Sequence, residues 1–225
     1  MTQVEYKACT QFVYRGGGFL RKRSAHPHPN WTGCPRRVFC RMRFPPLKRL
    51  LAGTILLCLA SCADTRHRLI VSIAEQRMVL LEDGRPLAMF PVSTSKFGIG
   101  SSGRSNFTPL GRHAIAKKIG GGQPSGMKFK SRKPTGEIVP VNAPGRDPIV
   151  TRILRLKGLE AQNNNTYSRY IYIHGTPEEY RIGTPASYGC VRMKSADVIR
   201  LYDRVGKGAL VDIIPGPVAT ALPLP

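Results

Sequence analysis

Residues 170–203 read YIYIHGTPEEYRIGTPASYGCVRMKSADVIRLYD, and this stretch decides the fold and the chemistry that we expect. Residues 170–173 form a short apolar run, which predicts a strand that delivers His174 at its end. A loop rich in Gly and Pro follows, and Cys190 then precedes a segment with helical spacing. Because strand ends and helix entries hold side chains exposed yet fixed, His174 and Cys190 are candidate functional residues.

The pattern on both sides of this stretch predicts a mostly β fold. A single convincing helix begins at Ser195, which we expect to cap it, and ends at Gly206. Its apolar face consists of Val198, Ile199, Leu201, Tyr202 and Val205. The strand-like runs are 68–73, 77–81, 87–93, 113–119, 170–174 and 209–214. Many short strands with one or two short helices favour a compact β-sandwich over residues 68–215, with 216–225 as a C-terminal tail.

The distribution of the six cysteines singles out one thiol. Five of them lie within the first 62 residues, and residues 63–225 contain only Cys190. A lone thiol cannot form an internal disulfide, so Cys190 is either a small buried side chain or a reactive group.

Acyl transfer by a thiol requires a nucleophile, a base that makes the thiolate and donors for the developing oxyanion. Cys190 meets the first requirement and His174 the second, since an imidazole takes and returns a proton near neutral pH. Gly189 removes side-chain bulk beside the nucleophile, so a substrate carbonyl can approach the amides of Gly189 and Cys190. We therefore expect a cysteine-dependent acyltransferase.

The motifs around these residues resemble the signature of the YkuD-type L,D-transpeptidases. The resemblance rests on His174-Gly175-Thr176, Ile182-Gly183, the run from Ser187 to Met193, and an upstream Thr108-Pro109-x-Gly111 turn. It implies a β-sandwich catalytic domain whose cysteine attacks the third residue of a peptidoglycan tetrapeptide stem and releases the terminal D-alanine. The acyl group then passes to an amine of another stem, to a lysine of an envelope protein or to water.

The resemblance also implies roles for single residues. Cys190 corresponds to the nucleophile, His174 to the general base and acid, and the Gly175 carbonyl to the group that orients the histidine. Ser187 and Gly189 would shape the substrate pocket, and Arg192 would hold the motif loop or a substrate carboxylate with its planar donors.

Tyr188 departs from the family pattern, because many members have histidine there. It leaves the catalytic pair intact and alters the expected contacts with substrate.

Three other functions are compatible with the same residues. Water in place of the acceptor amine would make the protein a carboxypeptidase or an amidase, and the sequence does not distinguish these outcomes. A peptidoglycan-binding module without turnover would not need Cys190 and His174. An unrelated thiol protease would cleave ordinary L-peptides.

The N-terminal segment predicts export and lipid anchoring. Residues 42–61 combine basic residues with an apolar run of 11 residues, which is typical of a signal peptide and too short to span a bilayer. Residues 59–62 resemble the bacterial lipobox, which predicts a lipidated Cys62, a linker over 62–67 and a periplasmic protein anchored to a membrane. Ala63 after that cysteine favours the outer membrane. Met42 is then the natural start of translation, and we expect residues 1–41 to be a mis-annotated or disordered N-terminal extension.

The formal net charge of +22 does not indicate a nucleic-acid partner. Residues 1–61 carry 11 of the 35 basic side chains and one of the 13 acidic ones, so much of the excess lies in the segment that we expect to be removed. No clear array of base-stacking aromatic residues accompanies the basic cluster at 128–133. The remaining charge suits a surface that faces anionic envelope polymers, or serves solubility alone.

Residues 120–148 are rich in Gly and Pro and long for a plain connection, so they form either a functional lid or a floppy surface loop. Within them, Gly121 and Gly126 have the spacing of a phosphate-binding loop, but Met127 replaces the required lysine. Cys34 and Cys40 lack the usual zinc spacing. We expect no metal and no organic cofactor, since thiol acyl transfer requires neither.

Overall fold

The computed structural model describes residues 63–222 of the 225-residue chain. The expected extension (1–41), signal peptide (42–61) and lipidated Cys62 lie outside the described residues. The strands are β1 (His67–Ser72), β2 (Arg77–Glu82), β3 (Arg85–Pro91), β4 (Gly111–Ile119), β5 (Met127–Lys130), β6 (Lys133–Ile138), β7 (Val150–Gly158), β8 (Tyr172–Gly175), β9 (Val191–Met193) and β10 (Leu210–Ile214). The helices are α2 (Ser195–Arg204) and the 3₁₀ turns η1 (Ala161–Thr166), η2 (Glu179–Arg181) and η3 (Val218–Thr220).

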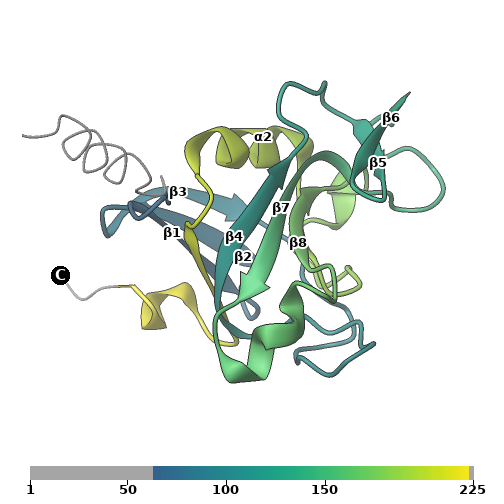
Figure 1. Cartoon of the computed structure of the whole chain (residues 1–225). Coiled ribbons are helices and arrows are strands. Elements are labelled where there is room, and N and C mark those ends of the chain that lie inside the picture. The colour runs from purple at the N-terminus through teal and green to yellow at the C-terminus, as the bar shows by residue number, and fades with distance from the viewer. Residues whose placement is uncertain (1–62, 223–225) are drawn as a thin grey trace, which may run out of the picture. The chain divides into compact units, whose positions relative to one another are not determined.

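The strands join in one mixed sheet in the order β3-β2-β1-β10-β4-β7-β5-β6, with β8 on β7 and β9 on β8 (Figure 1). The pairs β1–β10 and β8–β9 are parallel. Just after β3, Ser93 bridges Arg192 of β9, and each N–H donates to the other residue's carbonyl, at 2.9 and 2.8 Å. Because β3 and β9 are otherwise distant in the strand order, this bridge wraps the sheet around one buried face.

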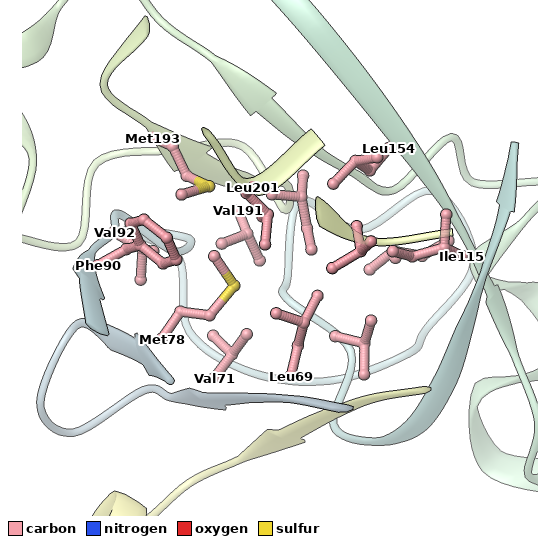
Figure 2. Close-up of a cluster of buried hydrophobic side chains, with 14 of the residues drawn as sticks. Leu69, Val71, Met78, Phe90, Val92, Ile115, Leu154, Val191, Met193 and Leu201 are labelled. Atoms are coloured by element: carbon pink, nitrogen blue, oxygen red, sulfur yellow. The ribbon is translucent and has the colours of Figure 1, made fainter. Parts of the chain in front are cut away.

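The wrapped sheet encloses a large hydrophobic core, in which side chains from distant strands interdigitate (Figure 2). Leu69 and Val71 of β1 are two residues apart and share this face, as the pleat of a strand requires. Leu154 of β7 and Met193 of β9 are buried in the same cluster. Full burial of each such side chain contributes about 1.5–3 kcal/mol. The prediction of a mostly β domain with few short helices is confirmed.

Helix α2 packs Val198 and Leu201 into the core, as its apolar spacing predicts, and its C-cap residue Val205 is buried in the same cluster. The prediction that Ser195 caps the helix was wrong, because Lys194 is the N-cap residue and has no capping side-chain bond. Instead, Glu179 Oε1 of η2 accepts the Ser195 N–H at 2.8 Å. A carboxylate distant in the sequence therefore satisfies a free amide of the helix N-terminus.

Strand β7 was missed from the sequence, although it is buried over almost its whole length. Its run VTRILRLKG contains three basic residues, which hide an apolar strand from pattern analysis. Arg152 donates to the Gln123 and Thr151 carbonyls, each at 2.7 Å. Arg155 donates to the Tyr167 carbonyl at 2.9 Å and lies 3.5 Å from the centre of the Tyr167 ring. Backbone oxygens and an aromatic face thus make the burial of these cations tolerable.

Residues 120–148 are not the floppy loop that was one alternative. They contain the β5–β6 hairpin, which projects beside β7 and β8 in Figure 1. Ser131 and Arg132 form its tip with φ angles of 50° and 67°, the left-handed conformation that a two-residue hairpin turn uses.

The described parts of the expected linker and tail, residues 63–67 and 216–222, are folded against the domain. The Asp64 N–H donates to the Lys207 carbonyl at 2.7 Å, and the Asp64 carboxylate accepts the N–H groups of Gly206 and His67. At the other end, Val218 of η3 is buried against β1 and β2. Between residues 63 and 222 there is no helix long and apolar enough to cross a bilayer.

His113 of β4 is fully buried. Its Nδ1 lies 2.9 Å from the Gly111 carbonyl and its Nε2 lies 3.2 Å from Thr166 Oγ1. Burial lowers the pKa of His113 below the ordinary 6.5. The unfolded chain therefore binds more protons below pH 6.5, so this stabilising contribution is present above that pH and is lost as the pH falls.

We predict that the unfolding free energy decreases on acidification from pH 7.5 to 5, by up to about 1.4 kcal/mol per pH unit for each histidine buried in this way. His113→Gln removes the titrating group and keeps a polar side chain, so the variant should lose less stability over this range. Thermal denaturation at a series of pH values measures both proteins. Identical pH slopes would contradict the assignment.

Candidate active site

His174 is held on β8 in a defined orientation. The side chain is buried, and Nδ1 lies 2.9 Å from the Gly175 carbonyl oxygen, the group that the family resemblance pointed to. Because a carbonyl only accepts hydrogen bonds, Nδ1 carries the proton and Nε2 is left with a lone pair. Burial lowers the pKa of His174, although the negative charge of Asp147 opposes this. The resting imidazole is therefore neutral and able to take a proton through Nε2.

Cys190 lies directly before β9, beside the same strand. The parallel register pairs Ile173 with Val191 and His174 with Arg192. Residues two apart on a strand project to the same face, so Cys190 and His174 project from the same side of the β8–β9 pair. Cys190 is half-buried and is the only free cysteine within residues 63–222. The two candidate catalytic groups are thus brought together by one short parallel pairing.

The surroundings of Cys190 favour the neutral thiol. Burial raises its pKa to about 11, against the opposing effects of the Tyr172 N–H and the Arg169 charge. The thiol lies 3.6 Å from the Tyr170 carbonyl oxygen, to which it donates. At neutral pH the resting site therefore holds a thiol and a neutral imidazole, not a preformed ion pair.

The Ser187 side chain stabilises the loop before Cys190 through hydrogen bonds to the loop's own backbone. It is almost fully buried, its hydroxyl donates to the Cys190 carbonyl at 2.5 Å, and the same oxygen accepts the Gly189 N–H at 3.2 Å. The Gly189 amide, expected as an oxyanion donor, is therefore already engaged by Ser187 in the resting protein.

Gly189 is required by both conformation and space. Its φ is +110°, and a Cβ would lie 3.2 Å from the Phe107 carbonyl oxygen and 3.3 Å from Ile171 Cδ1. The Gly189 carbonyl accepts a hydrogen bond from Thr108 Oγ1 at 3.1 Å, and Thr108 belongs to the upstream Thr-Pro-x-Gly turn. Two motifs that are 81 residues apart are thus in direct contact.

Tyr188 lies two residues before Cys190 and is 62% exposed. Its ring centre is 5.3 Å from that of Phe97, and Lys96 Nζ lies 4.7 Å from the ring centre and 3.3 Å from the hydroxyl. Tyr188 also borders a cavity of about 490 Å³. The cavity is lined by Gly145, Arg146, Asp147, Glu178, Arg181, Ala186, Tyr188 and Arg192.

Arg192 forms a buried ion-pair cluster. Its side chain is 2% exposed, and Nη1 donates to Asp147 Oδ2 and, at 3.0 Å, to Glu178 Oε2. These ion pairs link the motif strand β9 to the segments that carry Asp147 and Glu178. Nε and Nη2 of Arg192 are buried without a hydrogen-bond partner, so direct contact with a substrate carboxylate would require a rearrangement.

Two neighbours of Cys190 were not found from the sequence. Tyr170, with a φ of +59°, presents its carbonyl to the thiol. Arg169 donates to the carbonyls of Gly100, Ser105 and Phe107, which ties residues 100–107 to the turn behind the cysteine. Arg169 lies in a polar stretch, and Tyr170 was expected to begin the strand that leads to His174, so the sequence marks neither as a neighbour of the thiol.

The described residues contain no cluster of three or more His, Cys, Asp or Glu side chains that could hold a metal ion.

We predict that Gly189→Ala destabilises the fold more than Gly183→Ala. Both positions have a positive φ (+110° and +99°), so each substitution adds about 1–3 kcal/mol of backbone strain. A Cβ at Gly183 meets nothing within 4 Å, whereas at Gly189 it meets backbone oxygens of the Phe107 segment. Chemical denaturation of both variants measures the difference, and equal losses would contradict the contact.

Comparisons with known proteins identify the family of this domain. The YkuD family model, described as an L,D-transpeptidase catalytic domain, matches residues 66–213. The Escherichia coli K12 protein YcfS, a probable L,D-transpeptidase, is 27% identical over 158 residues, which are 68% of this chain and 45% of YcfS. ErfK/SrfK from the same organism, also a probable L,D-transpeptidase, is 30% identical over 160 residues, 68% of this chain and 46% of that protein.

The chain thus spans less than half the length of these two relatives. Among solved structures, an L,D-transpeptidase from Mycobacterium tuberculosis H37Rv is 17% identical, with a TM-score of 0.44 over 66% of this chain and 57% of that one. The family model covers well over half of the chain and contains all the motif residues described above. The chain therefore belongs to the YkuD family and carries an L,D-transpeptidase catalytic domain at residues 66–213.

Proposed function

We propose that this protein is a peptidoglycan L,D-transpeptidase in which Cys190 is the nucleophile and His174 the general base and acid. The observation that carries the proposal is the hydrogen bond between His174 Nδ1 and the Gly175 carbonyl. It leaves Nε2 free to accept a proton on the face from which Cys190 projects.

The reaction has two halves that share one thioester. His174 Nε2 takes the thiol proton as Cys190 Sγ attacks the carbonyl carbon of the third residue in a tetrapeptide stem. The bond to the terminal D-alanine breaks, and the imidazolium returns the proton to the leaving amine. An acceptor amine then attacks the thioester and loses a proton to His174. The carbon–sulfur bond breaks, and His174 returns the proton to the departing thiolate, which gives a new amide and a free thiol.

The neutral resting pair is consistent with this order of events. With the pKa of Cys190 near 11, only about one thiol in 10⁴ is ionised at pH 7, so proton transfer to His174 accompanies the attack. A substrate that excludes water strengthens the interaction between the charges that form.

Other residues of the motif shape this site. Ser187 and Gly189 set the loop conformation, and the amides of Gly189 and Cys190 are the candidate oxyanion donors. Since the Gly189 amide donates to Ser187 Oγ at rest, an oxyanion has to compete with that hydroxyl. The exposed ring of Tyr188 contacts the substrate at the entrance, together with Lys96.

We further propose that the protein acts in the periplasm, anchored to a membrane through Cys62. The apolar run and the Leu-Ala-Ser-Cys sequence at 59–62 support this placement, and Ala63 favours the outer membrane. The acceptor is an amine of a second stem or a lysine of an envelope protein.

Intact-mass spectrometry tests the catalytic role directly. The protein mixed with a purified tetrapeptide stem should gain the mass of the donor minus D-alanine, and free D-alanine should appear. Cys190→Ala should show neither, while His113→Gln, which alters a buried histidine away from the site, should keep both.

Addition of an acceptor amine then distinguishes transfer from hydrolysis to a shortened stem. Absence of both adduct and D-alanine, from folded protein with a reduced thiol, would argue for a binding module without turnover.

The mass of the protein extracted from membranes of a bacterial host tests the anchor. We expect residues 62–225 with a diacylglycerol on Cys62, and usually an additional amide-linked acyl chain. Cys62→Ala should abolish the lipid and release the protein from the membrane fraction. An unlipidated wild-type chain would contradict the proposal.

A further inference from the structure

Asp147 lies beside the candidate catalytic pair, although its role is not implied by the sequence motifs. It belongs to the segment between β6 and β7, and its side chain is 18% exposed. Oδ1 accepts a hydrogen bond from Thr176 Oγ1, and Oδ2 accepts one from Arg192 Nη1. Thr176 directly follows β8, and Arg192 is the central residue of β9.

The two strands that Asp147 connects are short. The β8–β9 ladder contains only three residue pairs, Ile173–Val191, His174–Arg192 and Gly175–Met193. The relative positions of His174 and Cys190 depend on this ladder, because each lies in or next to one of its strands. A side chain that binds both strands therefore adds a restraint where the backbone supplies few.

The charge of Asp147 also acts on both groups. It raises the pKa of His174 and that of Cys190, whereas Arg192 lowers both. Arg169 faces the thiol from the preceding turn, and Glu178 shares the Arg192 nitrogen. Asp147 thus favours a protonated imidazole and a protonated thiol.

We propose that Asp147 is a positioning residue, which joins Thr176 to Arg192 and thereby holds His174 in register with Cys190 for proton transfer. This inference rests on the roles proposed above for His174 and Cys190. In this role Asp147 acts through the two strands and through its charge.

The reactivity of the thiol tests this inference without any peptidoglycan substrate. The full chain is treated with iodoacetamide from pH 6 to 11 and digested with trypsin, and labelling is measured on the peptide 182–192, in which Cys190 is the only cysteine. Asp147→Asn should shift the labelling profile to lower pH by about 0.5–1 unit, the usual size of one neighbouring charge. Asp147→Glu should restore the wild-type profile.

The matched control is Asp197→Asn, which removes a carboxylate that is also largely buried and paired with an arginine, but on α2. It should leave the profile unchanged.

With the stem donor, Asp147→Asn should lower kcat by about tenfold or more and leave KM nearly unchanged, since positioning acts mainly in the transition state. Asp197→Asn should change neither.

Thr176→Val separates position from charge. It removes the hydroxyl that holds Oδ1 and keeps the Asp147 charge, so kcat should fall without a shift in the labelling profile. If Asp147→Asn does not fold, Thr176→Val alone tests the proposal, and an unchanged kcat of Thr176→Val would overturn it.

An Asp147→Asn profile that matches the wild type would equally overturn it. If the wild-type protein forms no acyl-enzyme, the proposed function fails, and the labelling profiles alone still decide whether Asp147 acts on the pair.

Discussion

The buried guanidinium of Arg192 is the group on which the rest of the structure depends. The backbone of Arg192 bridges Ser93 and closes the sheet. Its side chain neutralises Asp147 and Glu178, which lie in two different loops. In the β8–β9 ladder it is also the partner of His174. Loss of one member of a buried ion pair generally costs about 3–5 kcal/mol, because the other charge remains unpaired. The same residue therefore stabilises the fold and sets the geometry of the site.

Burial gives the candidate active site its chemical character. The environment that holds His174 and Cys190 in fixed positions also lowers the pKa of the imidazole and raises that of the thiol. Both effects favour the neutral forms, so Cys190 is a thiol at rest and becomes a thiolate only when it loses its proton. A thiol kept in this state is poorly nucleophilic toward other electrophiles, because the thiolate is the reactive species.

Much of the fold was predictable wherever the hydrophobic pattern was regular. The strands around 68–73, 77–81 and 113–119 and the apolar face of α2 were found because their residues alternate or recur at helical spacing. Strand β7 was missed because its buried arginines are satisfied by carbonyls and aromatic rings that come from elsewhere in the chain. The Ser195 cap failed for a related reason, since a carboxylate of η2 replaces it.

The sequence by itself determined the family and the mostly β class and singled out Cys190 and His174 as candidates, because these follow from residue type, spacing and local periodicity. Only the tertiary structure decided that Arg192 is an internal ion-pair partner, that Ser187 engages the Gly189 amide, and that Asp147 connects β8 to β9. The physical reason is that desolvation and pairing depend on neighbours brought together from distant segments, and neither spacing nor composition specifies those neighbours.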